Sequence, residues 1–251
     1  MNNFERSLTQ HVFKNLNQSF LLMSKIQQYQ DLKLLKELTI LGYRGGYLSL
    51  IFENLSANEF RGRVNIIINE PEKKDIVPFK TNFPFTELFY SEIQLPVNLS
   101  LILGSNNPVA KQFLFDFYEK LWKIKRSDFV QSIHPSSVIA STVIVGQGFQ
   151  MEPLSVIAPY TNIGFGVNIG RNCSVGHHNI LSNYCSVHFG SNLAGFTEIG
   201  ESTVIGPGCT VFSRVKIGRN TIIGGGSVVT KNIPSNVLAY GNPCTIVKNL
   251  N

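Results

Sequence analysis

The chain has 251 residues, of which 43% are apolar and 15% are charged. This composition is typical of a folded protein with a large core and excludes a disordered chain. The net charge of +6 comes from 22 basic and 16 acidic residues. Because the basic residues are scattered along the sequence, they favour an anionic small ligand over nucleic acid.

No apolar run reaches the roughly 20 residues that a membrane span requires, and the N-terminal apolar stretch is too short for a secretory signal. We therefore expect a cytoplasmic protein without an integral membrane segment. The four cysteines include no CxxC pair, so we expect reduced thiols and neither a disulfide framework nor a zinc ribbon.

Residues 1–36 are predicted to form a helical extension. Apolar residues spaced by three and four are typical of one face of an amphipathic helix, and here they are Phe4, Leu8, Val12, Leu16, Phe20 and Met23. We expect this face to pack on the same chain or on a neighbouring subunit. Attachment to a membrane surface is the alternative.

Residues 37–130 are predicted to form a small α/β domain of the Rossmann type. Apolar runs indicate buried strands, and glycine-rich turns lead from strands into helices. The strands are expected at 38–41, 64–69 and 99–103, and the turns at 42–46 and 104–107. Such βαβ units bind nucleotides beyond the carboxyl ends of their strands. The glycines can also serve only to turn a strand into a helix, and no P-loop lysine follows them.

Residues 131–251 contain a repeat. From Ile133 to Val229 every sixth residue is apolar, over 16 steps without a slip. A period of six indicates a short strand and a turn, repeated. Three such units close a triangular coil of about 18 residues, and coils stack at the strand spacing of about 4.8 Å. The sequence therefore predicts a parallel β-helix of five to six coils.

Three stretches of the sequence resemble a family of hexapeptide-repeat acetyltransferases, the sialic-acid O-acetyltransferases and nucleotide-amino-sugar N-acetyltransferases of the NeuD and PglD type. They are Ser132-Ile-His-Pro135 at the start of the repeat, Ser174–Gly195, and Gly241-Asn-Pro243. The resemblance covers roughly residues 37–250. It implies a left-handed β-helix, a homotrimer, and acetyl-CoA bound as co-substrate between neighbouring prisms.

The same resemblance implies that His177 is the general base, since a histidine in this stretch of the family takes the proton of the attacking sugar group. Neutral imidazole suits this task near pH 7. His178 stands where the family usually has a carboxylate that can orient the base. Another group then orients His177, or the activity is altered or lost, and His178 is a second candidate for the base.

Three further residues match the family's coenzyme site, and Lys231 and Lys248 are added as candidates for its phosphates. Gly195 lies about one coil after the histidine, where the family's backbone N–H stabilises the thioester oxyanion. Gly225 matches a glycine beside the pantetheine arm, and Pro243 matches the position that closes around the adenine.

The front domain of this family holds the nucleotide of the sugar substrate. The matching residues here are Gly42, Gly45, Asn69, Glu70, Gly104 and Asn106. Arg44 and Tyr47 stand where small residues are usual, so we expect them to narrow or reshape the nucleotide pocket.

We therefore expect an acetyltransferase that moves acetyl from acetyl-CoA to a sugar, with the amine of a nucleotide-linked amino sugar for a surface polysaccharide as the acceptor. Alternatives are a sugar O-acetyltransferase, on sialic acid or another glycan, and a non-catalytic β-helix scaffold or sensor. A zinc enzyme of the γ-carbonic-anhydrase type is disfavoured, and no metal is expected, because no two repeat histidines are about 18 residues apart and would stack.

Overall fold

A computed structural model describes residues 31–42, 45–69, 81, 83–93 and 99–250. The predicted N-terminal helix over 1–36 lies outside the described residues except for 31–36, which contain the short 3-10 helix η1 (Leu32–Leu34). Glu70 and Arg44 lie outside them as well. In the described ranges, no helix is both long and apolar enough to span a bilayer.

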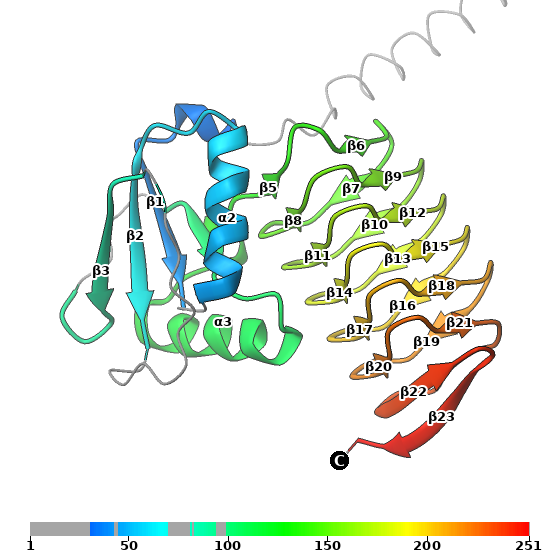
Figure 1. The fold of residues 1–251 in the computed structure, drawn as a ribbon. Helices are drawn as coiled ribbons and strands as arrows, with labels where there is room; N and C mark the ends of the chain where they lie inside the picture. The colour runs from blue at the N-terminus through cyan, green and yellow to red at the C-terminus, as the bar shows by residue number, and fades with distance from the viewer. Residues whose placement is uncertain (1–30, 43–44, 70–80, 82, 94–98, 251) are drawn as a thin grey trace, which may run out of the picture.

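The front part of the chain is a four-stranded parallel sheet between two helices (Figure 1). Its elements are β1 (Glu37–Leu41), α2 (Gly45–Ala57), β2 (Arg63–Ile68), β3 (Phe85–Phe89), β4 (Leu101–Leu103), α3 (Pro108–Trp122) and the 3-10 helix η2 (Arg126–Asp128). The strand order is β3-β2-β1-β4. This arrangement confirms the predicted α/β fold of the front part.

Both faces of the central strands are covered, because alternate residues pack under different helices. Ile40 and Ile66 belong to the core under α2, whereas Leu41 and Ile67 belong to the core under α3. Strands buried on both faces are apolar throughout, which is why the sequence predicts β1, β2 and β4. The sequence does not predict β3, because this edge strand is exposed over its first three residues.

The rest of the chain winds into a prism of short parallel strands (Figure 1). The strands are β5 (Ser132–Ile133), β6 (Val138–Ile139), β7 (Ile144–Val145), β8 (Gln150–Met151), β9 (Val156–Ile157), β10 (Asn162–Ile163), β11 (Asn168–Ile169), β12 (Ser174–Val175), β13 (Ile180–Leu181), β14 (Ser186–Val187), β15 (Asn192–Leu193), β16 (Glu198–Ile199), β17 (Val204–Ile205), β18 (Thr210–Val211), β19 (Lys216–Ile217), β20 (Ile222–Ile223) and β21 (Val228–Val229). The second residue of nearly every strand is buried in the prism core. The predicted period of six is confirmed.

Three sheets form the sides of the prism. The domain-facing sheet holds β5, β8, β11, β14, β17 and β20; the β6 sheet holds β6, β9, β12, β15, β18 and β21; the β7 sheet holds β7, β10, β13, β16 and β19. Paired strands are offset by one coil of 18 residues, as Asn162 and Ile180 show. The predicted coil length is therefore confirmed.

Turns at the edges of the prism join one sheet to the next. The histidine corner joins the β6 sheet to the β7 sheet and comprises the turns 140–143, 158–161, 176–179, 194–197, 212–215 and 230–232. The glycine corner joins the domain-facing sheet to the β6 sheet and comprises the turns 134–137, 152–155, 170–173, 188–191, 206–209 and 224–227. Since the prism has three sides, the histidine corner lies opposite the domain-facing sheet.

Small inward side chains hold neighbouring coils together. The Ser155 hydroxyl donates to the Gly170 carbonyl at 2.7 Å and accepts from the Cys173 amide at 3.0 Å. Ser191 bonds in the same way to Gly206 and Cys209. The cysteines Cys173, Cys185 and Cys209 are buried in this layer, and these three and Cys244 are free thiols.

An antiparallel hairpin, β22 (Val237–Gly241) and β23 (Cys244–Asn249), closes the end of the prism. Its first strand continues the domain-facing sheet beyond β20. The Gly241 amide donates to the Ser227 hydroxyl at 3.1 Å, so the turn of the hairpin lies at the last coil of the glycine corner.

The front domain packs on the domain-facing sheet through buried polar contacts as well as apolar ones. The Tyr47 hydroxyl donates to Gln150 Oε1 at 2.9 Å and accepts from Asn168 Nδ2 at 2.8 Å. Gln150 in turn donates to the Leu103 carbonyl at 2.9 Å. The bulk of Tyr47 therefore joins α2 to the β-helix, which corrects our expectation that it reshapes the nucleotide pocket.

Candidate active site

His177 lies in the turn between β12 and β13, on the exposed histidine corner. The preceding apolar residue, Val175, points into the prism and is 1% exposed. The tight turn brings Gly176 against the next coil, where a Cβ would lie 2.7 Å from the Ala194 carbonyl carbon. Because His177 is exposed, its imidazole is directed out of the prism rather than into its core.

The imidazole of His177 lies directly against Gly195 of the next coil. A Cβ added to Gly195 would come within 2.8 Å of both Cε1 and Nε2 of the ring. The Phe196 amide donates to the His177 carbonyl at 2.9 Å, which fixes the two turns in register. Within the described part of the chain, the Gly195 N–H has no hydrogen-bond acceptor. A free backbone donor next to an exposed imidazole suits a reaction that develops negative charge on oxygen.

His178 contacts the other nitrogen of the His177 ring. The two Nδ1 atoms are 3.0 Å apart, a hydrogen-bond distance at which one ring donates and the other accepts. The contact occupies Nδ1 of His177 and leaves its Nε2 on the side of Gly195.

A column of stacked side chains runs along the histidine corner at intervals of 18 residues: Tyr160, His178, Phe196 and Arg214. The His178 ring centroid is 4.8 Å from that of Tyr160 and 4.8 Å from that of Phe196, with which it is nearly parallel at 20°. The Arg214 guanidinium carbon lies 4.8 Å from the Phe196 centroid. Sequence analysis missed Tyr160, Phe196 and Arg214, although their 18-residue spacing is visible in the sequence.

All four residues of this column have left-handed backbone, with φ between 56° and 66°. Such a conformation directs a non-glycine side chain outward at a tight turn and is uncommon for bulky residues. The three rings of the column, capped by Arg214, therefore form an aromatic ridge beside His177.

The remaining predicted coenzyme residues lie apart from the His177–Gly195 pair. Lys231 is exposed in the last turn of the histidine corner. It follows β21, which is three strands along the β6 sheet from β12, or about 14 Å at the strand spacing. Gly225 and Pro243 lie at the last coil of the glycine corner and in the adjoining hairpin turn. One chain therefore presents these residues on two different edges.

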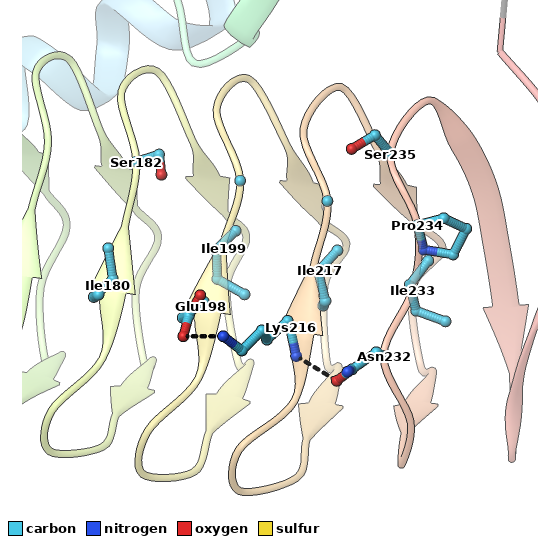
Figure 2. A pocket seen from close by; sticks show the side chains of 12 residues that line it. Ile180, Ser182, Glu198, Ile199, Lys216, Ile217, Asn232, Ile233, Pro234 and Ser235 are labelled. Atoms are coloured by element: carbon cyan, nitrogen blue, oxygen red, sulfur yellow. Dashed lines mark hydrogen bonds and ion pairs between the residues drawn. The ribbon is translucent and has the colours of Figure 1, made fainter.

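A groove of 520 Å³ lies on the β7 sheet beside the histidine corner (Figure 2). Ile180 stands at one end, and the segment 232–235 closes the other end. Lys216 and Glu198 form an ion pair of 2.7 Å across the groove, and the Lys216 amide donates to Asn232 Oδ1 at 2.8 Å. The groove gives the histidine corner a partly apolar, partly charged flank.

The predicted nucleotide-binding residues of the front domain lie at the carboxyl ends of its strands. Gly42 follows β1 with φ +88°, and a Cβ on Gly104 would lie 2.3 Å from the Gly42 carbonyl oxygen. Asn69 follows β2, and its Oδ1 accepts from the Tyr118 hydroxyl at 2.6 Å. Gly45 begins α2. The structure therefore brings Gly42 and Gly104 together and places Asn69 at the same sheet edge.

Asn106 links this sheet edge to the β-helix, because its carbonyl oxygen accepts a hydrogen bond from the Ser186 hydroxyl on the domain-facing sheet. Lys111, which sequence analysis missed, is fully buried nearby and donates to the Gly166 carbonyl at 2.7 Å. Burial lowers the pKa of Lys111 to about 7. These nucleotide-binding candidates therefore lie on the opposite side of the prism from His177 of the same chain.

Comparisons with known proteins agree with this architecture. Residues 196–231 match the family model described as bacterial transferase hexapeptide (six repeats). A variant of perosamine N-acetyltransferase from Caulobacter crescentus, solved with CoA and GDP-perosamine, superposes with a TM-score of 0.69 at 25% identity, over 84% of this chain and 97% of that chain. The chain has the fold of the left-handed β-helix sugar acetyltransferases. No curated protein matches the sequence.

Two more solved structures share this left-handed β-helix fold. The acetyltransferase domain of PglB from Neisseria gonorrhoeae FA1090, in complex with acetyl coenzyme A, has a TM-score of 0.68 at 20% identity, over 84% of this chain and 99% of that chain. WeeI from Acinetobacter baumannii AYE has a TM-score of 0.63 at 20% identity, over 84% and 100%. The left-handed β-helix expected from the resemblance is confirmed.

Proposed function

We propose that this protein transfers acetyl from acetyl-CoA to the amine of a nucleotide-linked amino sugar. The observation that carries the proposal is the contact between the exposed His177 ring and Gly195, whose N–H has no acceptor among the described residues. Support comes from the structural similarity to an N-acetyltransferase solved with CoA and GDP-perosamine.

His177 is the general base in this proposal. As the sugar amine attacks the thioester carbonyl carbon, its proton passes to Nε2 of His177. The carbonyl oxygen becomes an oxyanion and accepts a hydrogen bond from the Gly195 N–H, a type of contact whose loss costs about 100-fold or more in rate. The tetrahedral intermediate then collapses, the C–S bond breaks, and the CoA thiolate takes the proton from Nε2.

The proposed site requires more than one copy of the chain. The nucleotide-binding candidates lie beside the domain-facing sheet, and the histidine corner is opposite that sheet. We therefore infer a homotrimer in which the histidine corner of one copy meets the glycine corner and front domain of a neighbour. Lys231 would bind a phosphate of the coenzyme from one side of this seam, and Gly225 and Pro243 would bind the coenzyme from the other.

The direct test is release of free CoA from acetyl-CoA in the presence of GDP- and UDP-linked amino sugars, with free hexoses and sialic acid as alternative acceptors. We expect turnover with a nucleotide amino sugar and a fall of about 100-fold or more in His177→Ala, the usual cost of losing a general base. Gln147→Ala, which changes an exposed residue in the turn between β7 and β8, outside both corners of the proposed seam, is the control and should keep full activity.

Equal rates for wild type and His177→Ala would contradict the proposed base. Turnover only with hydroxyl acceptors would make the protein a sugar O-acetyltransferase. Binding of CoA without turnover on any acceptor would favour a scaffold.

A further inference from the structure

We propose that His178 is a positioning residue that accepts a hydrogen bond from Nδ1–H of His177 and so holds Nε2 of His177 as the free base. The proposal rests on the proposed function, in which Nε2 takes the substrate proton. A carboxylate commonly accepts this hydrogen bond from a catalytic histidine. Here the neutral ring of His178 would accept it instead.

The first step is the geometry of the two rings. Their Nδ1 atoms are 3.0 Å apart, so a single hydrogen lies between them when both rings are neutral. If His178 donated this hydrogen, His177 would carry its own hydrogen on Nε2 and could not act as a base there. The direction of this one hydrogen bond therefore decides whether Nε2 is a base.

The second step is the surroundings of Nε2. This atom of His177 lies against Gly195, where a Cβ would be 2.8 Å away. The Gly195 N–H is already a donor without an acceptor in the described residues. A hydrogen on Nε2 would place a second donor beside the Gly195 N–H, whereas a lone pair places an acceptor beside that donor. His178 is exposed, so its own Nε2–H can donate to water.

The third step is the rigidity of His178. Its ring lies between Tyr160 and Phe196, with both centroids at 4.8 Å, and its backbone is left-handed with φ 56°. A side chain held on both faces loses little further freedom when it orients a neighbour. The titratable or charged groups that face it are His177, Tyr160 and, beyond Phe196, the Arg214 guanidinium.

Three substitutions separate the hydrogen bond from the stack. His178→Phe keeps an aromatic ring and removes the acceptor, and Phe196 shows that phenylalanine adopts this left-handed backbone in the next coil. His178→Asn keeps an acceptor oxygen on a residue type that favours this conformation. His178→Glu supplies a carboxylate acceptor.

We expect kcat of His178→Phe to fall at least 10-fold with little change in KM, and kcat of His178→Asn to stay within about threefold of wild type. A carboxylate stabilises a protonated imidazole, so His178→Glu should remain active with the acidic limb of its kcat/KM profile moved to higher pH. Unchanged kcat in His178→Phe would overturn the proposal, as would an unmoved acidic limb in an active, folded His178→Glu.

The closing experiment reads the tautomer directly, by ¹⁵N NMR of the histidine rings at pH 8. We expect His177 to carry hydrogen on Nδ1 in wild type and to lose this preference in His178→Phe. Hydrogen on Nε2 of His177 in wild type would overturn the proposal. This spectrum does not depend on turnover, so it remains informative if His177→Ala retains activity and the proposed function fails.

Discussion

The contact between His177 and Gly195 depends on the absence of a side chain at position 195. The backbone of Gly195 is outside the left-handed region, so alanine could adopt its conformation, but the new methyl group would meet Cε1 and Nε2 of the ring at 2.8 Å. Because these atoms are at the free end of an exposed side chain, the ring would swing away rather than disrupt the coil.

We therefore predict that Gly195→Ala folds with a melting temperature within a few degrees of wild type but loses about 100-fold or more in kcat, because the base leaves the oxyanion donor. Circular dichroism and CoA-release kinetics check the two parts. Ser213→Ala, at the same position of the next coil, is the control. A Gly195→Ala enzyme with wild-type kcat would show that the contact is not needed.

The sequence predicts which residues of this site lie side by side, because residues one coil apart in the repeat stack on each other. His177 and Gly195 are 18 residues apart, so the repeat alone places them in neighbouring coils. The role of His178 was not predictable in this way. Its contact with His177 depends on the left-handed backbone of His178 and on the rings above and below it, and the repeat period determines neither.

Helix α2 is joined to the prism by a buried hydrogen-bonded group centred on Tyr47, which is 7% exposed. Its hydroxyl bonds to both Gln150 and Asn168. Burial raises the pKa of the Tyr47 phenol well above its usual range, so the group stays a neutral hydroxyl that can donate and accept together.

We predict that Tyr47→Phe lowers the free energy of unfolding by about 1–3 kcal/mol, since it leaves buried polar groups of Gln150 and Asn168 without their partner. Urea denaturation measures this change. Tyr240→Phe is the control, because Tyr240 is 49% exposed. A loss in Tyr47→Phe no larger than that of the control would mean that the hydroxyl contributes little to docking.

The sequence predicts those strands whose burial is visible in their own pattern of apolar residues. The inward-facing residues of the prism strands are apolar, and so are most of the buried residues of β1, β2 and β4. Docking of the front domain depends on polar residues such as Gln150, Asn168 and Ser186, which occupy outward positions of the repeat and give no local signal of burial. The sequence therefore does not predict that Tyr47 is a docking residue.

Lys111 links the stability of the whole molecule to pH. It is fully buried between α3 and the prism, and burial lowers its pKa from 10.5 to about 7. Above pH 7 the folded chain releases this proton while the unfolded chain keeps it, so the unfolded state binds more protons. Stability therefore rises with pH from about 7, whereas below pH 7 both states hold the proton and the slope disappears.

We predict that the free energy of unfolding of wild type, relative to Lys111→Met, increases between pH 7 and 9 with a slope of at most about 1.4 kcal/mol per pH unit. Urea denaturation of both proteins at several pH values measures the difference and cancels the groups they share. Parallel pH profiles would mean that Lys111 titrates normally in the fold.

The proposed site residues lie on two separate edges of the prism, which bears on how copies of the chain assemble. A single prism presents His177, Gly195 and Lys231 on one edge and Gly225 with Pro243 on another. In a cyclic trimer, each edge of one copy can face the other edge of its neighbour. The central claim is that His177 acts at such a seam with the glycine corner of a second copy.

The most direct measurement is complementation between two inactive variants, His177→Ala and Gly225→Trp, co-expressed with different tags and purified as mixed trimers. Every mixed trimer contains one seam with both edges intact, so we predict about a third of wild-type CoA release from proteins that are inactive alone. Mixed trimers as inactive as either parent would contradict a site shared between copies.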